Sequence, residues 1–396
     1  MDLTVDFCGI SLKNPLLAGS CDLARSPAHL RTLVESGIGG VVMKSFADVP
    51  SLQKASIAKF LCLDPALQPW KSGQQVGGFY SRGGGMLSEE EWDEEADQAL
   101  PLAKGHGVLM IGSICASTLE NWRRMAQRMQ EKGVGMIELN LGNPHYTVAP
   151  GLIGARISQA EDLLGEVIRT VAEAVTIPVI AKLSPQVSNI VHLAELAKRS
   201  GASAVTVSHR FQGLLIDIEK KEPLGSIPFG YGGPWMLPIA IGYVAKVARE
   251  VGIPICGSGG IFGGKDVLQF VMAGAETIQV TTALLIHGSG LIGSMLKDIE
   301  DFCKRKGVKK IGELVGCALG KKGYYDRLPE TARMEVQNSH FCRTCPRKPC
   351  IEACCFDAIQ KKAGDGVVEV LDSCTACGFC LQVCPFPGAL AMKENT

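Results

Sequence analysis

The sequence has 396 residues, 46% of them hydrophobic and 20% charged, a balance typical of a globular protein with a large core. Its forty basic and forty acidic side chains cancel, which argues against nucleic acid or an anionic membrane as the main partner. The first residues lack the basic and apolar regions of a signal peptide, and no apolar run approaches the roughly 20 residues of a membrane helix. The cysteine usage indicates reduced thiols, so we expect a cytoplasmic protein.

Eight short aliphatic runs alternate with amphipathic helical stretches. The runs are Pro15–Gly19, Gly40–Lys44, Val108–Ser113, Met136–Asn140, Val179–Leu183, Ala204–Ser208, Ile253–Gly257 and Thr277–Val280. The helical patterns between them include Ala28–Ser36, Leu119–Lys132, Ala160–Ala174, Ile190–Ser200 and Pro238–Val251. Near-continuous apolar strands are typical of a parallel sheet buried on both faces. Eight such units predict an α/β fold, a (β/α)8 TIM barrel, with a doubly wound open sheet as the alternative.

Three further segments surround or interrupt this pattern. Leu3–Cys8 and Ser11–Leu12 predict a hairpin that closes the bottom of the barrel. The connection from Ser45 to about Glu89 is long and rich in glycine, as lids and binding loops are. A polar stretch of weak periodicity follows the last helix, so we expect a barrel domain over 1–318, a linker over 319–338 and a small module over 339–396.

The small module contains nine of the sixteen cysteines. Those in 374–385 follow the bacterial ferredoxin pattern, C-x2-C-x2-C-x3-C-P, in which the fourth cysteine binds the other cluster. Those in 342–354 follow the same pattern with two extra residues before the third cysteine. We therefore predict a ferredoxin-like module with two [4Fe-4S] clusters. One would take Cys342, Cys345, Cys350 and Cys384, and the other Cys354, Cys374, Cys377 and Cys380.

Two alternatives remain for these cysteines. A pair of zinc knuckles needs two ligands in each half, typically spaced C-x2-C, which the run in 374–385 does not fit. Cys355 could replace Cys354 as a ligand, although the x3 spacing favours Cys354. With either Cys354 or Cys355 as the ligand, two clusters would form an electron conduit, which implies a redox centre at its end.

Glycines and hydroxyls follow the last two barrel strands, in 256–260 and 279–282. Free backbone N–H groups in such loops bind phosphate. A dinucleotide fingerprint would need a third glycine where Phe262 stands, so a mononucleotide is the better prediction than NAD. Clusters deliver single electrons and most organic reductions need two, and FMN converts between them.

Polar side chains also end four of the other strands. The residues are Lys44, Ser45, Ser113, Asn140 and Lys182. A lysine in such a position is sometimes a surface residue whose ammonium reaches water. Because active sites of TIM barrels lie at the carboxyl ends of the strands, we expect these side chains to point into the site.

Together these motifs resemble the dihydroorotate dehydrogenase family, and most of all the flavin-plus-ferredoxin part of dihydropyrimidine dehydrogenases. The resemblance covers nearly the whole chain and rests on the segments 6–16, 41–45, 181–185, 230–233, 257–261 and 279–282 and on the cysteine-rich end. It implies that Ala18 and Gly19 lie against the isoalloxazine of FMN and that Lys44 lies near the ring. It further implies that Ser45, Asn140 and Lys182 bind the polar edge of the ring. Ribityl and phosphate would be surrounded by Gly233, Gly259, Gly260, Thr281 and Thr282.

The chain departs from this family in the catalytic loop after the fourth strand. Relatives carry a cysteine or serine that transfers the substrate proton, and here the position holds Asn143. An amide does not titrate near neutral pH, and general acid–base help is typically worth about 10²–10⁴-fold. His145 on the same loop and His209 after the sixth strand stand where relatives have asparagines. Either could serve as the acid or simply donate hydrogen bonds, and Tyr146 is a lesser candidate.

We therefore expect an FMN- and iron–sulfur-dependent oxidoreductase that acts on a carbon–carbon bond activated by a carbonyl. Tyr80, Arg82 and Arg210 could meet an anionic or carbonyl-bearing substrate, or could be surface residues. Electrons would come from a ferredoxin or an NAD(P)H-oxidising flavoprotein subunit, and the protein would be oligomeric. The alternatives are a dihydropyrimidine dehydrogenase subunit with a relocated acid, and an electron-transfer subunit that has lost its substrate chemistry.

Overall fold

The computed structural model describes residues 1–144, 153–224, 229–321 and 332–394. It divides into two compact units, Met1–Leu319 and Gly320–Thr396, which are described separately. No helix in these ranges is both long enough and apolar enough to span a bilayer.

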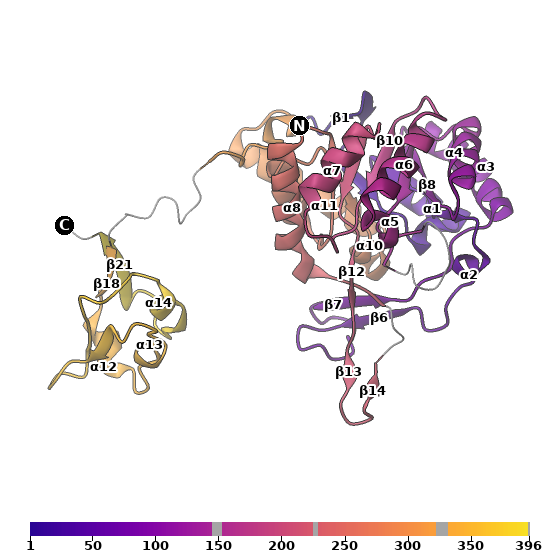
Figure 1. Cartoon of the computed structure of the whole chain (residues 1–396). Helices are drawn as coiled ribbons and strands as arrows, with labels where there is room; N and C mark the ends of the chain where they lie inside the picture. Colours follow the sequence, from indigo (N-terminus) through magenta and orange to yellow (C-terminus); the bar gives the residue numbers. More distant parts are fainter. Residues whose placement is uncertain (145–152, 225–228, 322–331, 395–396) are drawn as a thin grey trace. The chain divides into compact units, whose positions relative to one another are not determined.

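The first unit is built on a closed parallel sheet (Figure 1). Its strands are β3 (Leu16–Ala18), β4 (Gly40–Val42), β8 (Leu109–Cys115), β9 (Met136–Asn140), β10 (Val179–Lys182), β11 (Ala204–Val207), β16 (Ile255–Ser258) and β17 (Thr277–Val280). They pair in the order β4, β3, β17, β16, β11, β10, β9, β8, and β4 also pairs with β8. An open sheet would leave two unpaired edges, so the predicted TIM barrel is confirmed and the doubly wound alternative is excluded.

Helices surround the barrel because each buries one apolar face against the strands. The long ones are α1 (Pro27–Glu35), α3 (Glu89–Gly105), α4 (Leu119–Lys132), α6 (Glu161–Ala172), α7 (Ile190–Arg199), α8 (Leu237–Glu250), α9 (Gly264–Met272) and α11 (Gly290–Lys306). In α4 the Thr118 hydroxyl caps the first turn, Gly133 ends the helix with φ 97°, and Trp122 and Met129 are fully buried. Burying a large apolar side chain contributes about 1.5–3 kcal/mol, so this face holds α4 on the barrel.

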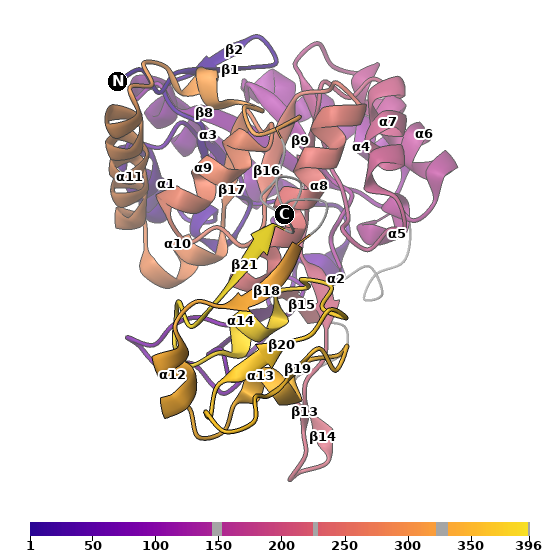
Figure 2. The same cartoon turned by 90° about the vertical axis from the view of Figure 1, so that its left-hand side faces the viewer.

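A hairpin covers the amino ends of the strands, as the sequence predicted (Figure 2). It consists of β1 (Val5–Phe7) and β2 (Ile10–Leu12), and the Phe7 side chain is fully buried. The Cys8 thiol donates to the carbonyl of Ser203, just before β11. The hairpin therefore closes the face opposite the candidate site.

The carboxyl face carries an antiparallel sheet of four strands from two distant loops. Strands β6 (Phe60–Leu63) and β7 (Gly78–Ser81) follow β4, whereas β12 (Phe211–Gly213) and β15 (Phe229–Gly232) follow β11. Tyr80 stacks on Tyr231 with ring centroids 4.3 Å apart. The long connection is therefore an ordered cover over part of the barrel.

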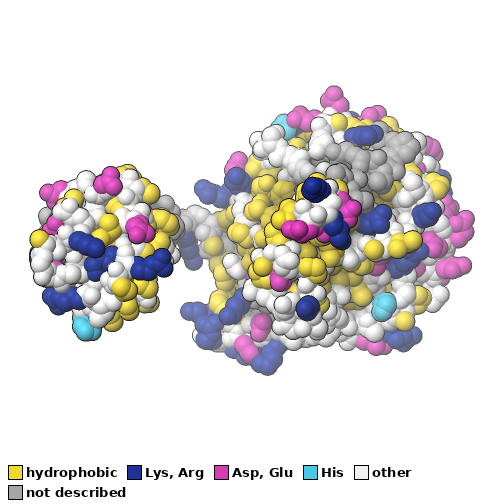
Figure 3. All heavy atoms as spheres, turned by 90° about the horizontal axis from the view of Figure 1, so that it is seen from below, with side chains coloured by type: hydrophobic (Ala, Val, Ile, Leu, Met, Phe, Trp, Pro, Cys, Tyr) yellow, Lys and Arg dark blue, Asp and Glu magenta, His cyan; other side chains and the backbone are white. Residues whose placement is uncertain are grey.

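A second hairpin projects from this cover. It consists of β13 (Ile216–Asp217) and β14 (Glu222–Pro223), and Ile216 and Ile218 are exposed. Figure 3, which looks onto this side of the barrel unit, shows hydrophobic side chains around charged ones.

The described part of the second unit, 320–321 and 332–394, has two small antiparallel sheets and three short helices. One sheet pairs β18 (Ala332–Val336) with β21 (Leu390–Glu394), and the other pairs β19 (Ile359–Lys361) with β20 (Val368–Val370). The helices are α12 (Ser339–Thr344), α13 (Pro349–Glu352) and α14 (Phe379–Val383).

The segment expected to be a linker, 319–338, contains one of these strands. Strand β18 lies in that segment and belongs to the second unit, because Met334 is buried in the unit's core. The strand was missed because the residues around it are polar and its apolar pattern spans few residues.

Candidate active site

Two adjoining cavities open among the carboxyl ends of the barrel strands. The first, which we call the glycine cavity, includes Gly232, Gly233, Gly259, Gly260, Thr281 and Thr282. The second, the lysine cavity, includes Asp22, Lys44, Lys59, Asn140, Asn143 and Arg210. Ser20, His209, Arg210 and Thr281 line both. Two molecules bound in these two cavities would therefore contact each other.

The glycine cavity is shaped by backbone that only glycine adopts readily. Gly259 and Gly260 have φ values of 120° and 79°, which L side chains rarely adopt. A side chain at Gly260 would also overlap the backbone of Leu237. Backbone N–H groups can approach an anion closely where no side chain intervenes. The five residues predicted to surround ribityl and phosphate all line this cavity.

A buried ion pair lies beneath the glycine cavity. The Lys182 ammonium donates to Gln279 Oε1 at 2.7 Å and to Glu138 Oε1 at 3.2 Å. The Thr206 hydroxyl donates to the other oxygen of Glu138 at 2.8 Å, and the Gln279 amide donates to that oxygen too. Glu138 is 1% exposed, so its charge is balanced entirely within the protein. Lys182 is thus held beside the cavity and is not a surface residue.

Sequence reasoning missed Glu138 and Gln279 as site residues. The signal was present in β9, where Glu138 and Asn140 are two residues apart and therefore project from the same face of the strand. A carboxylate within an apolar barrel strand is expensive unless it is paired. That rule would have suggested Lys182 on the neighbouring strand as its partner.

A chain of hydroxyls lies on the other side of the barrel mouth. Ser45 and Ser113 hydroxyls are 2.8 Å apart, Ser20 is 3.2 Å from Ser45, and the Asn140 amide donates to Ser45 at 3.2 Å. Among the described residues the Asn140 carbonyl oxygen, Oδ1, is buried and has no partner. An unsatisfied buried acceptor costs about 1–3 kcal/mol. A bound molecule that offers an N–H at this point would satisfy it.

Ala18 ends β3 and Gly19 follows it. Ala18 is fully buried, and a side chain at Gly19 would overlap the Thr281 hydroxyl. Neither residue is among those that line the two cavities, whereas the next residue, Ser20, lines both.

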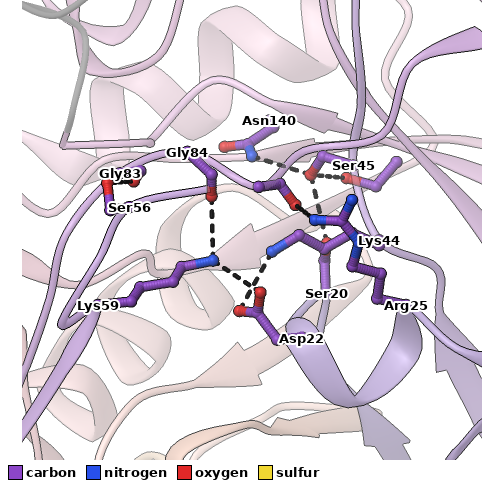
Figure 4. A network of polar contacts seen from close by, with 12 residues as sticks. Ser20, Asp22, Arg25, Lys44, Ser45, Ser56, Lys59, Gly83, Gly84 and Asn140 are labelled. Atoms are coloured by element: carbon purple, nitrogen blue, oxygen red, sulfur yellow. Dashed lines mark hydrogen bonds and ion pairs between the residues drawn. The ribbon is translucent and has the colours of Figure 1, made fainter. Parts of the chain in front are cut away.

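The lysine cavity carries an excess of positive charge. Its described lining includes four basic side chains, Lys44, Lys59, Arg82 and Arg210, and one carboxylate, Asp22. Asp22 accepts from Lys59 at 2.7 Å and from Lys44 at 3.3 Å (Figure 4). Burial works against ionisation of Asp22, but the two lysines hold the pKa of this carboxyl below its usual range. No sequence motif singles out Asp22 or Lys59.

Burial also perturbs two of the cations. Burial and the neighbouring Lys44 ammonium lower the pKa of Lys59 to about 8, although Asp22 opposes the shift. Burial lowers the pKa of Arg210 to about 10. Both side chains remain charged at neutral pH, so the cavity suits an anionic or strongly polarised ligand.

The loop after β9, which was predicted to be catalytic, is described only up to residue 144. Asn143 is buried and lines the lysine cavity, and its backbone carbonyl accepts from the Ala155 N–H at 2.9 Å. His145 and Tyr146 lie outside the described residues. His209 lines both cavities, and its Nδ1 accepts from the Arg210 N–H at 2.9 Å, which places the ring proton on Nε2.

Tyr80 and Arg82 differ in position. Tyr80 is buried in the aromatic stack of the cover and does not line the lysine cavity, whereas Arg82 does, and it donates to the Ile57 carbonyl at 2.8 Å. Only Arg82 and Arg210 of that predicted trio therefore face the cavity.

A separate cavity lies within the second unit. Among its lining residues are Cys342, Cys345, Cys350 and Cys384, the four cysteines predicted to share one cluster. The Lys348 ammonium also lines it and donates to the carbonyls of Cys342 and Cys345 at 2.7 and 3.0 Å.

The other four cysteines of the predicted ligand set lie in the same unit. The Cys354 sulfur accepts from the Ala358 N–H at 3.2 Å, and the Cys374 sulfur accepts from the Met334 N–H at 3.5 Å. Cys380 is buried and Cys377 and Cys355 are exposed. In the described ranges, no three His, Cys, Asp or Glu side chains are placed to hold a single metal ion.

Comparison with known proteins gives a consistent picture for the first unit. Residues 77–303 match the family model described as Dihydroorotate dehydrogenase. The catalytic subunit of dihydroorotate dehydrogenase B (NAD(+)) from Pyrococcus abyssi is 32% identical over 320 residues, which cover 80% of this chain and 99% of that protein. The corresponding subunit from Thermoplasma volcanium is 30% identical over 323 residues, with coverage of 80% and 99%.

Proposed function

This chain belongs to the dihydroorotate dehydrogenase family, whose members are FMN-dependent oxidoreductases acting on CH–CH groups, and we propose that it couples such a reaction to two [4Fe-4S] clusters. The substrate would carry a carbonyl conjugated to the reacting carbon–carbon bond. The observation that carries the proposal is the pair of adjoining cavities, one suited to a phosphate-bearing cofactor and the other to a polar substrate.

The residues around the two adjoining cavities fit FMN, with its phosphate end in the glycine cavity and its ring reaching the edge of the lysine cavity. Gly233, Gly259, Gly260, Thr281 and Thr282 would hold the phosphate and ribityl. The unsatisfied Asn140 oxygen would accept an N–H of the flavin ring, with Lys44, Ser45 and Ser113 nearby. Lys182 would hold positive charge beside the ring and so favour its anionic reduced form. FMN, when bound, exchanges a hydride with the substrate and single electrons with a cluster.

The rest of the lysine cavity, around Lys59, Arg82 and Arg210, would hold the substrate. Its cations would polarise the substrate carbonyl and attract negative charge, and the buried Asn143 amide would donate to it or accept from it. Most of the asparagines by which relatives recognise a pyrimidine are replaced in this chain. At one of these positions His209 lines the cavity. We therefore favour a substrate other than uracil, thymine or orotate.

The cysteine cavity supports the cluster proposal. A cubane occupies a cavity among four thiolates, and four such cysteines line this one. Backbone N–H groups directed at Cys354 and Cys374 are typical of iron–sulfur ligation, where they tune the cluster. The second cluster would take Cys354, Cys374, Cys377 and Cys380. The curated relatives are named as catalytic subunits of an NAD(+)-dependent enzyme, so we expect a ferredoxin or a flavoprotein subunit as the electron partner.

Anaerobic photoreduction followed by a panel of acceptors tests this function. The reduced protein is mixed with orotate, uracil, thymine, 2-cyclohexenone or crotonyl-CoA, and flavin absorbance is followed. We expect rapid reoxidation by a non-pyrimidine acceptor. Rapid reoxidation by uracil alone would favour the dihydropyrimidine dehydrogenase reading, and reoxidation by none would favour an electron-transfer subunit. Iron and sulfide analysis, with eight of each per chain expected for two cubanes, tests the clusters independently.

A further inference from the structure

The reaction needs a proton donor that the catalytic loop position does not supply. Asn143 occupies the position of the family's acid, and an amide cannot deliver a proton near neutral pH. The backbone N–H of Arg210 donates to Nδ1 of His209. An imidazolium carries hydrogens on both nitrogens, so this contact disfavours the charged, acidic form of His209.

Lys59 lies in the same cavity and has the chemistry that Asn143 lacks. It comes from the cover, immediately before β6, and reaches back to Asp22 and to the Gly84 carbonyl at 2.7 and 3.0 Å. Its side chain is 13% exposed. An ammonium has three N–H groups, and these two contacts leave one for a ligand in the lysine cavity.

The surroundings of Lys59 explain why its proton is available. The Lys44 and Arg210 cations repel it, and Arg25 also approaches this place, since both Arg25 Nη1 and Lys59 Nζ lie within about 3.3 Å of a side chain added at Gly85. Asp22 is the carboxylate that faces it. Burial, with the Lys44 and Arg210 cations, lowers the pKa of Lys59 to about 8, close to the operating pH that suits a general acid.

We propose that Lys59 donates the substrate proton in place of the family's catalytic loop residue. This inference rests on the proposed function and assigns its missing step. Reduction of the C=C bond adds a hydride from reduced FMN to one carbon and a proton from Lys59 to its neighbour. Two N–H bonds break, one in the reduced flavin and one in Lys59, the C=C bond becomes a single bond, and two C–H bonds form. The substrate gains two electrons and two hydrogens, FMN is oxidised by two electrons, and the neutral amine is reprotonated from water. In the oxidative direction the neutral amine accepts the proton.

The central experiment measures flavin reoxidation across pH 6–10 in the holoprotein, with the fastest acceptor of the panel. In the wild type the rate should fall as pH rises through about 8, because Lys59 must be protonated to act. Lys59→Met should lower the rate by about 10²–10⁴-fold and abolish the fall in rate near pH 8, which we call the pH limb. Lys54→Met, an exposed lysine on the same loop, should leave rate and profile unchanged.

Lys59→Arg separates proton donation from charge attraction. Arginine keeps the positive charge but does not release a proton in proteins. If Lys59 is the acid, Lys59→Arg should be about as slow as Lys59→Met. Recovery of the wild-type rate in Lys59→Arg, or a pH limb that persists in Lys59→Met, would overturn the assignment.

A second measurement needs no substrate and no variant. Acetic anhydride acetylates neutral amines, so the labelling of Lys59 and Lys54, read by peptide mass spectrometry, reports when each loses its proton. Lys59 should reach half-maximal labelling near pH 8, whereas an ordinary lysine does so near pH 10.4. Equal titration of the two would contradict the inference. Wild-type flavin that no acceptor reoxidises would instead overturn the proposed function.

Discussion

The barrel and the cysteine-rich unit both bury a lysine ammonium, but they balance its charge differently. Lys182 in the barrel meets the carboxylate of Glu138 and the amide oxygen of Gln279. Lys348 is 6% exposed and donates to two backbone carbonyls, and it has no carboxylate partner among the described residues. A buried cation without an anion is costly. The charge of Lys182 is therefore balanced within the barrel, whereas that of Lys348 would be balanced by added negative charge, such as that of the proposed thiolate-bound cluster.

The largest effect should come from removing the anion of the complete pair. Glu138→Gln keeps the size of the side chain but leaves Lys182 as an unpaired buried cation, so unfolding free energy should fall by about 3–5 kcal/mol. Equilibrium denaturation of the full chain, followed by circular dichroism, measures it. Adding Lys182→Met should restore part of the loss, and a single variant as stable as the wild type would contradict this account.

A third way of handling buried charge occurs at Glu95 in α3. Both of its carboxylate oxygens are buried and lack partners in the described structure, and burial raises its pKa to about 8. A group whose pKa is raised on folding binds its proton more tightly in the native state. Its contribution to stability therefore falls as pH rises from its ordinary value toward 8.

Glu95→Gln should remove this pH dependence. In the wild type unfolding free energy should fall by up to about 1.4 kcal/mol per pH unit across that window. Glu95→Gln should flatten the curve and be more stable than the wild type at pH 8. If unfolding free energy changed with pH in the same way in both proteins, Glu95 would be ionised and paired in solution, which would contradict this prediction.

The prediction that negative charge of a cluster balances Lys348 can be tested by removing this lysine. A cation beside a cluster favours the more negative, reduced state. Lys348→Met should lower the midpoint potential of one cluster by roughly 59 mV, which is tenfold in the ratio of oxidised to reduced forms for one electron. Titration followed by electron paramagnetic resonance measures both clusters, with the exposed Lys361→Met as the control. A shift in the midpoint potentials of both clusters, or of neither, would contradict the placement of Lys348 beside one cluster.

The smallest effect should come from a charge pair that water already screens. Lys304 and Glu300 lie 3.1 Å apart on α11 and are largely exposed. Glu300→Gln should change unfolding free energy by about 0.3–0.5 kcal/mol. A loss approaching that of Glu138→Gln would mean that burial is not what separates the two pairs.

The sequence predicted those features that short patterns determine. The eight strands were confirmed, and the ends of the five predicted helices lie within two residues of the observed ones. Apolar runs and capping residues such as Thr118 and Gly133 act locally. Cys342, Cys345, Cys350 and Cys384 line one cavity, and their role as ligands of one cluster stays a prediction.

What the sequence did not reveal depends on contacts between distant segments. Asp22 and Lys59 meet across 37 positions, and neither belongs to a recognisable motif. Glu138 was hidden within an apolar strand, although its partner Lys182 was identified. The prediction for Tyr80 was ambiguous because a tyrosine near a site packs or binds equally well, and tertiary stacking on Tyr231 decided it.

The antiparallel cover joins two loops into one mechanical part. Gly230 and Tyr231 of β15 pair with Ser81 and Tyr80 of β7, so neither loop keeps its shape without the other. A loop transplanted alone from a relative would expose an unpaired strand edge, which favours aggregation. Engineering a new specificity into this scaffold would therefore require exchanging both insertions together, as a single cassette.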